Sequence, residues 1–230
     1  MYLLDKGIKK PLLVINFKNY AVAQGDKALD LALAAQRVAA RKKVQIAVAP
    51  PIPTLFYVAK NVEIPVLAQH SDIAFSEAST GHLPIFSLKP NRVKGSIINH
   101  SERRLNKEQI EESTKMLKRE KLVSLVCVRD SKEAEEVASF APDIIAVEPP
   151  ELIGSGKAVS KVSPSLVSDT VRAVKRIDDR ITVLCGAGIS SKEDVQASIA
   201  LGAEGVLVAS AILLSKNQES SIEDMADRLS

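Results

Sequence analysis

The sequence contains no tryptophan, and only 3% of its residues are aromatic. Few side chains are therefore available to stack on bases, and the net charge of +3 is too small and too scattered to attract a polyanion. No apolar run approaches the roughly 18 residues that a membrane span requires. The first ten residues also lack the apolar core of a signal peptide. We expect a cytoplasmic protein that binds neither nucleic acid nor a membrane.

Cysteine is also scarce. Cys127 and Cys185 lie far apart, each inside an apolar run, and we expect both to be buried, reduced thiols. No group of His, Cys and Asp residues has the spacing of a metal site, and no dinucleotide-binding fingerprint follows the first apolar segment. The sequence therefore predicts no metal and no cofactor.

The chain is built from one repeating pattern of an apolar, β-branched segment and a helical segment. The predicted strands are 12–17, 44–49, 65–70, 95–100, 122–128, 143–148, 181–186 and 205–210. The predicted helices are 26–41, 106–121, 131–140, 164–177 and 191–201, with a weak helix at 85–91 and with Asn106 and Ser163 as N-caps. A doubly wound open sheet is possible. Eight such units in 230 residues favour a single (β/α)8 TIM barrel of eight parallel strands over residues 1–230.

Chemically useful side chains stand where these predicted strands end. Asn16 and Lys18 follow the first strand, His100 ends the fourth, and Glu148 ends the sixth. Small residues, among them Gly188, Ala209 and Ser210, follow the seventh and eighth, where barrels of this kind often bind phosphate. Each feature alone is common at strand ends. The carboxyl ends of all strands meet at one rim, so together they predict one site. The segment after Glu148 has two prolines and then two glycines, which is typical of a hinged lid.

Short motifs in the same order resemble those of triosephosphate isomerases, in the shorter form found in archaea. They are Asn16-Phe17-Lys18, Thr80-Gly81-His82, Asn99-His100-Ser101-Glu102, the stretch from Val147 to Gly154, Cys185-Gly186-Ala187-Gly188, and the stretch from Gly205 to Ser210. They span nearly the whole chain. The lid has no tryptophan, as in the archaeal pattern, and Ala211 departs from it where glycine is expected.

The resemblance implies the interconversion of dihydroxyacetone phosphate and D-glyceraldehyde 3-phosphate, in sugar breakdown or synthesis. It makes Glu148 the catalytic base and His100 the electrophile, which we expect to be neutral because it stands at a helix start. Lys18 and Asn16 would position and polarise the substrate. The residues implied to contact the phosphate are Ile153, Gly188, Ala209 and Ser210.

The resemblance also implies a homo-oligomer. Residues 71–83, with Thr80 at the tip, would reach into a neighbouring subunit, giving a dimer at least and a tetramer by the archaeal pattern. Two alternatives remain: another phosphosugar enzyme on the same barrel, and a phosphometabolite-binding protein without activity. The first does not explain why Glu148, His100 and Lys18 occur together, and the intact Glu148 argues against the second.

Overall fold

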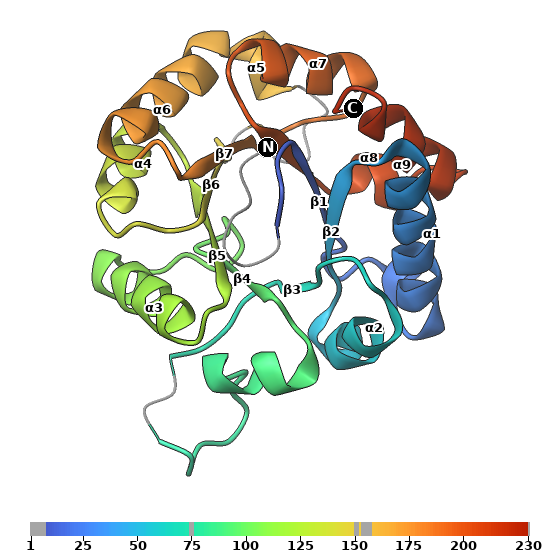
Figure 1. Cartoon of the computed structure of the whole chain (residues 1–230), viewed down its shortest axis with the longest axis vertical. Helices are drawn as coiled ribbons and strands as arrows, with labels where there is room; N and C mark the ends of the chain where they lie inside the picture. The colour runs from blue at the N-terminus through green and yellow to red at the C-terminus, as the bar shows by residue number, and fades with distance from the viewer. Residues whose placement is uncertain (1–7, 74–75, 150–151, 153–157, 230) are drawn as a thin grey trace.

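The computed structural model describes residues 8–73, 76–149, 152 and 158–229. Its strands form one eight-stranded parallel sheet in the order β2-β1-β8-β7-β6-β5-β4-β3. A parallel bridge between Val48 and Val66 joins β2 to the segment leading into β3, so the sheet closes on itself. Figure 1 shows the strands as a central ring with the helices around it. The predicted TIM barrel is confirmed.

The strands are shorter than the sequence predicts, mostly by one or two residues at an end. Their bounds are β1 Leu12–Asn16, β2 Gln45–Ala49, β3 Leu67–Ala68, β4 Gly95–Ile98, β5 Val123–Val128, β6 Ile144–Val147, β7 Thr182–Cys185 and β8 Gly205–Val208. The residues trimmed from the carboxyl ends form the rim that carries the predicted site.

The predicted helices all form. They are α1 Asp26–Lys42, α3 Lys107–Arg119, α4 Ser131–Ala138, α6 Pro164–Ile177 and α7 Lys192–Ala200. Asn106 caps α3, accepting the Gln109 N–H at 2.8 Å while the Gln109 side chain accepts the Asn106 N–H. Ser163 is the N-cap of α6, as predicted, but its side chain makes no capping hydrogen bond. The φ of −138° and ψ of 63° at Ser163 belong to the turn that connects two helices.

The weak helix predicted at 85–91 is instead two 3-10 turns, η3 Ile85–Ser87 and η4 Lys89–Asn91. The elements that were not predicted are η1 Ala21–Ala23, η2 Ile52–Thr54, α2 Leu55–Asn61, α5 Val159–Val162, α8 Ser210–Leu213 and α9 Gln218–Ala226.

Alternation along each strand separates two apolar cores. On β1, Leu12 and Val14 point into the barrel interior, while Leu13 and Ile15 pack against the surrounding helices. On β6, Ile144 and Ala146 likewise point inward. If the same alternation continues, Asn16 and Glu148 are the next inward positions. The interior core therefore leads directly to the site at the barrel mouth.

Helix α9 packs against α1 and joins it through ion pairs (Figure 1). Arg37 contacts Glu219 at 2.6 Å, and Arg41 contacts Glu219 at 2.9 Å and Glu223 at 3.2 Å. These ion pairs are partly exposed, so they contribute less to the stability of the fold than their number suggests.

Residues 76–83 project away from the ring of helices, and Thr80 is exposed. Asp72 holds the base of this projection. It accepts the Leu83 N–H at 2.7 Å and pairs with Arg103 at 2.9 Å and with His70 at 3.2 Å. Across the described ranges, none of the helices has the length and apolar character needed to cross a membrane.

Candidate active site

Glu148 follows β6 and faces the barrel mouth. Its N–H donates to the Val128 carbonyl at 2.7 Å, which fixes its backbone beside β5. The side chain is only 6% exposed, and Oε2 has no hydrogen bond with any described residue. Burial raises the pKa of Glu148 to about 7, against smaller opposite effects of the Cys127 thiol and of Lys18 and Arg104. This carboxylate is buried, open on one side, and able to exchange a proton near neutral pH.

Gly186 leaves the space that the Glu148 carboxylate occupies. A Cβ at position 186 would lie 2.5 Å from Glu148 Cγ and 3.0 Å from Oε1. No side chain larger than hydrogen fits there unless Glu148 moves. The sequence predicts small residues after this strand for binding phosphate; at Gly186 the structure adds the role of making room for the Glu148 carboxylate.

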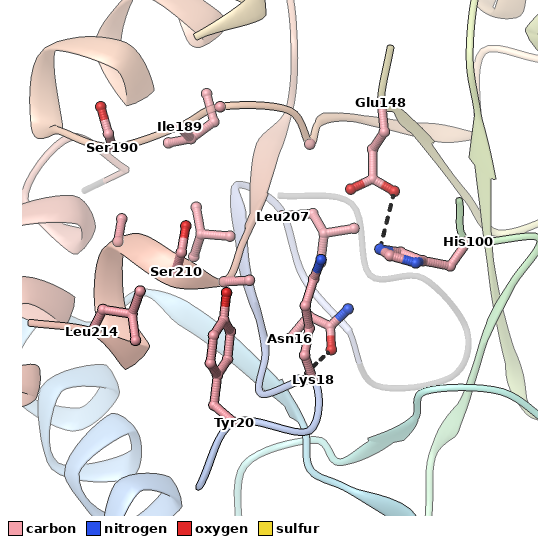
Figure 2. Close-up of a pocket in the computed structure, with 15 residues that line it drawn as sticks. Asn16, Lys18, Tyr20, His100, Glu148, Ile189, Ser190, Leu207, Ser210 and Leu214 are labelled. Atoms are coloured by element: carbon pink, nitrogen blue, oxygen red, sulfur yellow. Dashed lines mark hydrogen bonds and ion pairs between the residues drawn. The ribbon is translucent and has the colours of Figure 1, made fainter. Parts of the chain in front are cut away.

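Asn99 places His100 at the same mouth. Ile97 of β4 points into the barrel interior. In a regular strand every second residue points to the same side, so Asn99 would point inward and His100 outward. Instead Asn99 has a φ of 60°, and its side chain donates to the Cys127 carbonyl at 2.9 Å and accepts the Leu105 N–H at 2.9 Å. The alternation breaks there. His100 then enters the cavity, where its Nε2 lies 3.9 Å from Glu148 Oε2 (Figure 2).

Hydrogen bonding defines the tautomer of His100. The backbone N–H of Glu102 donates to Nδ1 at 3.2 Å, so Nδ1 carries a lone pair and the proton of a neutral ring is on Nε2, toward the cavity. Burial, and after it the charge of Lys18, lowers the pKa of His100 to about 4. The expectation that a helix start keeps this ring neutral is wrong, because α3 begins only at Lys107. Burial is the main cause.

Lys18 and Asn16 form the third part of the site. The Asn16 Oδ1 accepts the Lys18 N–H at 3.0 Å, and the Gln69 side chain donates to the Lys18 carbonyl at 2.9 Å. These contacts hold Lys18 at a φ of 46°, a left-handed conformation that costs about 1–2 kcal/mol for a residue with a side chain. The Lys18 side chain is only partly exposed, and among the described residues the carboxylate it pairs with is that of Glu102, 3.9 Å away. Its charge therefore remains available to an anionic ligand.

Two turns of small residues form the opposite wall. Gly188 has a φ of 69° and lines the cavity with Ile189, Ala209, Ser210 and Ala211. No described residue accepts a hydrogen bond from the backbone N–H of Ser210 or Ala211. Free N–H groups beside a cavity suit an anion.

A single cavity of about 240 Å³ joins all these parts. It is lined by Asn16, Lys18, His100, Glu148, Gly188, Ala209 and Ser210, which are all but one of the predicted site residues. The remaining one, Ile153, lies outside the described residues, as does most of the predicted lid. In the part of the chain that the structure describes, no group of three His, Cys, Asp or Glu side chains has the arrangement of a metal site.

Known proteins match the chain over nearly its full length. A family profile described as triosephosphate isomerase covers residues 11–225. The chain belongs to the triosephosphate isomerase family. Among its relatives, the triosephosphate isomerase of Methanothermus fervidus is 44% identical over 94% of this chain and 97% of its own. Those of Methanocaldococcus jannaschii and Methanosarcina barkeri are 44% and 42% identical over similar shares.

Membership of the triosephosphate isomerase family confirms the resemblance, including its archaeal character, and makes the chain a member of an enzyme family. The structure adds cavity residues that the sequence did not single out. Tyr20, Ser190 and Leu214 line the same cavity, and Gln69 supports Lys18. Strand alternation gives no signal for Tyr20, because the chain turns at Lys18 and Asn19 before it reaches the cavity.

Proposed function

We propose that the chain interconverts dihydroxyacetone phosphate and D-glyceraldehyde 3-phosphate through an enediolate intermediate. The observation that carries this proposal is the pairing of Glu148 and His100, whose Oε2 and Nε2 atoms lie 3.9 Å apart at the mouth of one cavity. A base and a hydrogen-bond donor at this separation can act on adjacent carbon and oxygen atoms of one small substrate.

Glu148 acts as the base. Its carboxylate removes a proton from C1 of dihydroxyacetone phosphate and returns it to C2, which gives the aldehyde. A pKa of about 7 suits both directions, because the group accepts a proton readily yet is ionised in a large share of molecules at neutral pH. Oε2 has no hydrogen bond with any described residue, so no such contact has to break before it takes a proton.

His100 stabilises the enediolate. Its Nε2–H donates to the oxygens on C1 and C2, and the hydroxyl proton of O1 passes through Nε2 to O2, so the ring is the same neutral donor before and after the reaction. Nδ1 accepts the Glu102 N–H and holds the ring in place. Lys18 adds a positive charge close to the developing oxyanion and to the phosphate. Asn16 acts on Lys18 by accepting its N–H, and lines the cavity itself.

The phosphate lies at the far end of the cavity, against Gly188, Ala209 and Ser210. Free backbone N–H groups at Ser210 and Ala211 support this placement. We further propose that Ile153 and the segment around it close over the bound phosphate. Closure excludes water, which protects the enediolate from losing its phosphate. The binding energy of the phosphate holds that closed state.

Residues 1–230 act, in this proposal, as one barrel domain in the cytoplasm, without metal or cofactor. The projecting segment with exposed Thr80 docks on a second copy of the chain and gives a dimer, or a tetramer made of dimers. Support comes from the shape of this segment and from its base, which Asp72 holds in place.

Replacing Glu148 tests the reaction and the base together. We expect purified wild-type protein to isomerise the triose phosphates in a coupled assay, and Glu148→Gln to lower kcat by at least about a thousandfold while inorganic phosphate still binds. Glu135→Gln, on the exposed side of α4, is the matched control and should turn over normally. A silent wild type would leave only the binding-protein alternative, and an active Glu148→Gln variant would remove Glu148 from the role of base.

A further inference from the structure

We propose that Tyr20 is a substrate-binding residue whose phenol hydroxyl donates a hydrogen bond to the phosphate group of the ligand. The inference rests on the proposed function for the identity of that ligand. It adds a phenol donor to a phosphate end that already has backbone N–H groups, the Ser210 side chain and Lys18.

Tyr20 belongs to the same cavity as the catalytic residues but lies at its other end. It lines that cavity with Ser210, Ala211 and Leu214. Figure 2 shows its ring standing upright, with the hydroxyl pointing toward Ser210 and away from the side that carries Glu148 and His100. A ligand that places its reacting carbons beside Glu148 therefore extends its phosphate toward this hydroxyl.

The hydroxyl of Tyr20 makes no hydrogen bond with any described residue. The ring is partly buried and packs against the main apolar core, so only its polar tip reaches the cavity. Leu214 and Ala211, which line the cavity beside it, have no polar side-chain atom, and no hydrogen bond joins the hydroxyl to Ser210. Partly buried tyrosines usually find a partner for this group. Here the cavity contents must supply it.

The backbone holds Tyr20 firmly. Its carbonyl accepts the Ala23 N–H at 2.9 Å and the Gln24 side-chain N–H at 3.5 Å, and its φ of −61° and ψ of 137° are those of an unstrained extended residue. Two residues earlier, the Lys18 N–H is bonded to Asn16. A turn at Lys18 and Asn19 leads to Tyr20, and the side chains of Lys18 and Tyr20 both line the cavity, so both are in place before a ligand arrives.

A phenol is suited to this position. It donates to a phosphate oxygen, and it adds no second positive charge near His100. Hydrogen bonds from a neutral donor to an anion are stronger than those between neutral groups. The contact also distinguishes a phosphorylated triose from the triose alone, because only the former has an acceptor at this end of the cavity.

Tyr20→Phe tests the hydroxyl by removing one oxygen atom. We expect KM for dihydroxyacetone phosphate and Kd for inorganic phosphate each to rise about tenfold, with kcat changed less than threefold. With D-glyceraldehyde, which has no phosphate, kcat/KM should be the same in Tyr20→Phe and wild type. The control is Tyr57→Phe, which removes the same oxygen from an exposed tyrosine on α2.

The outcomes separate this inference from the proposed reaction. Unchanged KM and unchanged phosphate Kd in Tyr20→Phe would overturn the role of Tyr20 while the isomerase assay still stands. An equal loss with D-glyceraldehyde would also overturn it, since the effect would then be structural. If wild type failed to isomerise triose phosphates, the calorimetric Kd for inorganic phosphate would still decide whether the hydroxyl contacts the anion.

Discussion

At the scale of single residues, the site depends on two titrating side chains whose pKa values move in opposite directions. Burial acts on both. It raises the pKa of Glu148 to about 7 from an ordinary 4.5, because a buried carboxylate is harder to ionise, and lowers that of His100 to about 4, because a buried imidazole is harder to charge. Above pH 7 the pair is therefore a carboxylate beside a neutral ring, which is the state that the proposed reaction uses.

The pH dependence of kcat/KM should follow Glu148. We expect activity to fall as pH decreases through about 7, because Glu148 gains the proton that blocks it, with no separate contribution from His100 above pH 5. The substrate phosphate also ionises, at roughly pH 6, and its ionisation overlaps the decrease in kcat/KM on the acidic side of the profile. Repeating the profile with D-glyceraldehyde removes that contribution. A midpoint near 4.5 would contradict the shifted pKa.

Gly186→Ala should disturb catalysis without disturbing phosphate binding. The new Cβ would lie 2.5 Å from Glu148 Cγ, so the carboxylate must move. A displacement of about 1 Å costs on the order of a hundredfold in rate, and we expect kcat to fall by that amount. Circular dichroism and the Kd for inorganic phosphate should stay near wild type. Wild-type kcat would show that the carboxylate tolerates the shift.

At the scale of elements, Asp194 connects the phosphate turn to the far side of the predicted lid. This buried side chain, the N3 residue of the α7 capping box, accepts hydrogen bonds from the Ser190 N–H and hydroxyl at 2.9 Å each and from the Ser191 N–H at 3.0 Å. Its other oxygen contacts Lys161 of α5 at 2.6 Å. In addition, the Val159 N–H donates to the Ala187 carbonyl at 3.1 Å.

Asp194→Ala should therefore affect both stability and substrate binding. We expect a loss of about 3 kcal/mol in the free energy of unfolding, because buried N–H groups lose their acceptor. KM for dihydroxyacetone phosphate should rise about tenfold as the turn loosens. Lys161→Ala removes only the half-exposed ion pair and should cost less than about 1 kcal/mol, with KM unchanged. Equal KM values in all three proteins would show that the turn is held by other contacts.

Sequence patterns predicted the barrel and most of its elements, because apolar strands, charged helix faces and capping residues are local signals. Helix α6 was predicted at its observed bounds. The missed elements lack such signals: α2 is a short apolar segment, and α9 buries only Ile222, Met225 and Ala226. Tertiary packing decides both.

The site was predictable where strand ends carry reactive groups, as with Glu148. It was not predictable where a contact depends on how deeply a side chain is buried or on an unusual backbone conformation. The left-handed Asn99 that turns His100 inward has no signal in the sequence, and neither has the approach of Gly186 to Glu148. The predicted cause of the neutral state of His100 was wrong for the same reason. Burial lowers the pKa of this ring, and burial is a property of the folded chain.

At the scale of the whole molecule, the projecting segment around Thr80 should control assembly. We expect wild type to sediment as a dimer or tetramer at micromolar concentration, and Thr80→Arg to shift it toward monomer, because a long charged side chain at the tip cannot enter a close-packed interface. Ser220→Arg, on the exposed face of α9, should leave assembly unchanged. Monomeric wild type would contradict the proposed oligomer.

Barrel closure also orders the events of synthesis. Strand β1 pairs with β2 through Leu12↔Gln45 and with β8 through Leu12↔Gly205, so its second neighbour leaves the ribosome almost 200 residues after it. Until then one edge of β1 has open peptide groups, and α1 lacks the cover of α9. The nascent chain therefore passes through a long period in which a half-built sheet must avoid pairing with its neighbours on the same polysome.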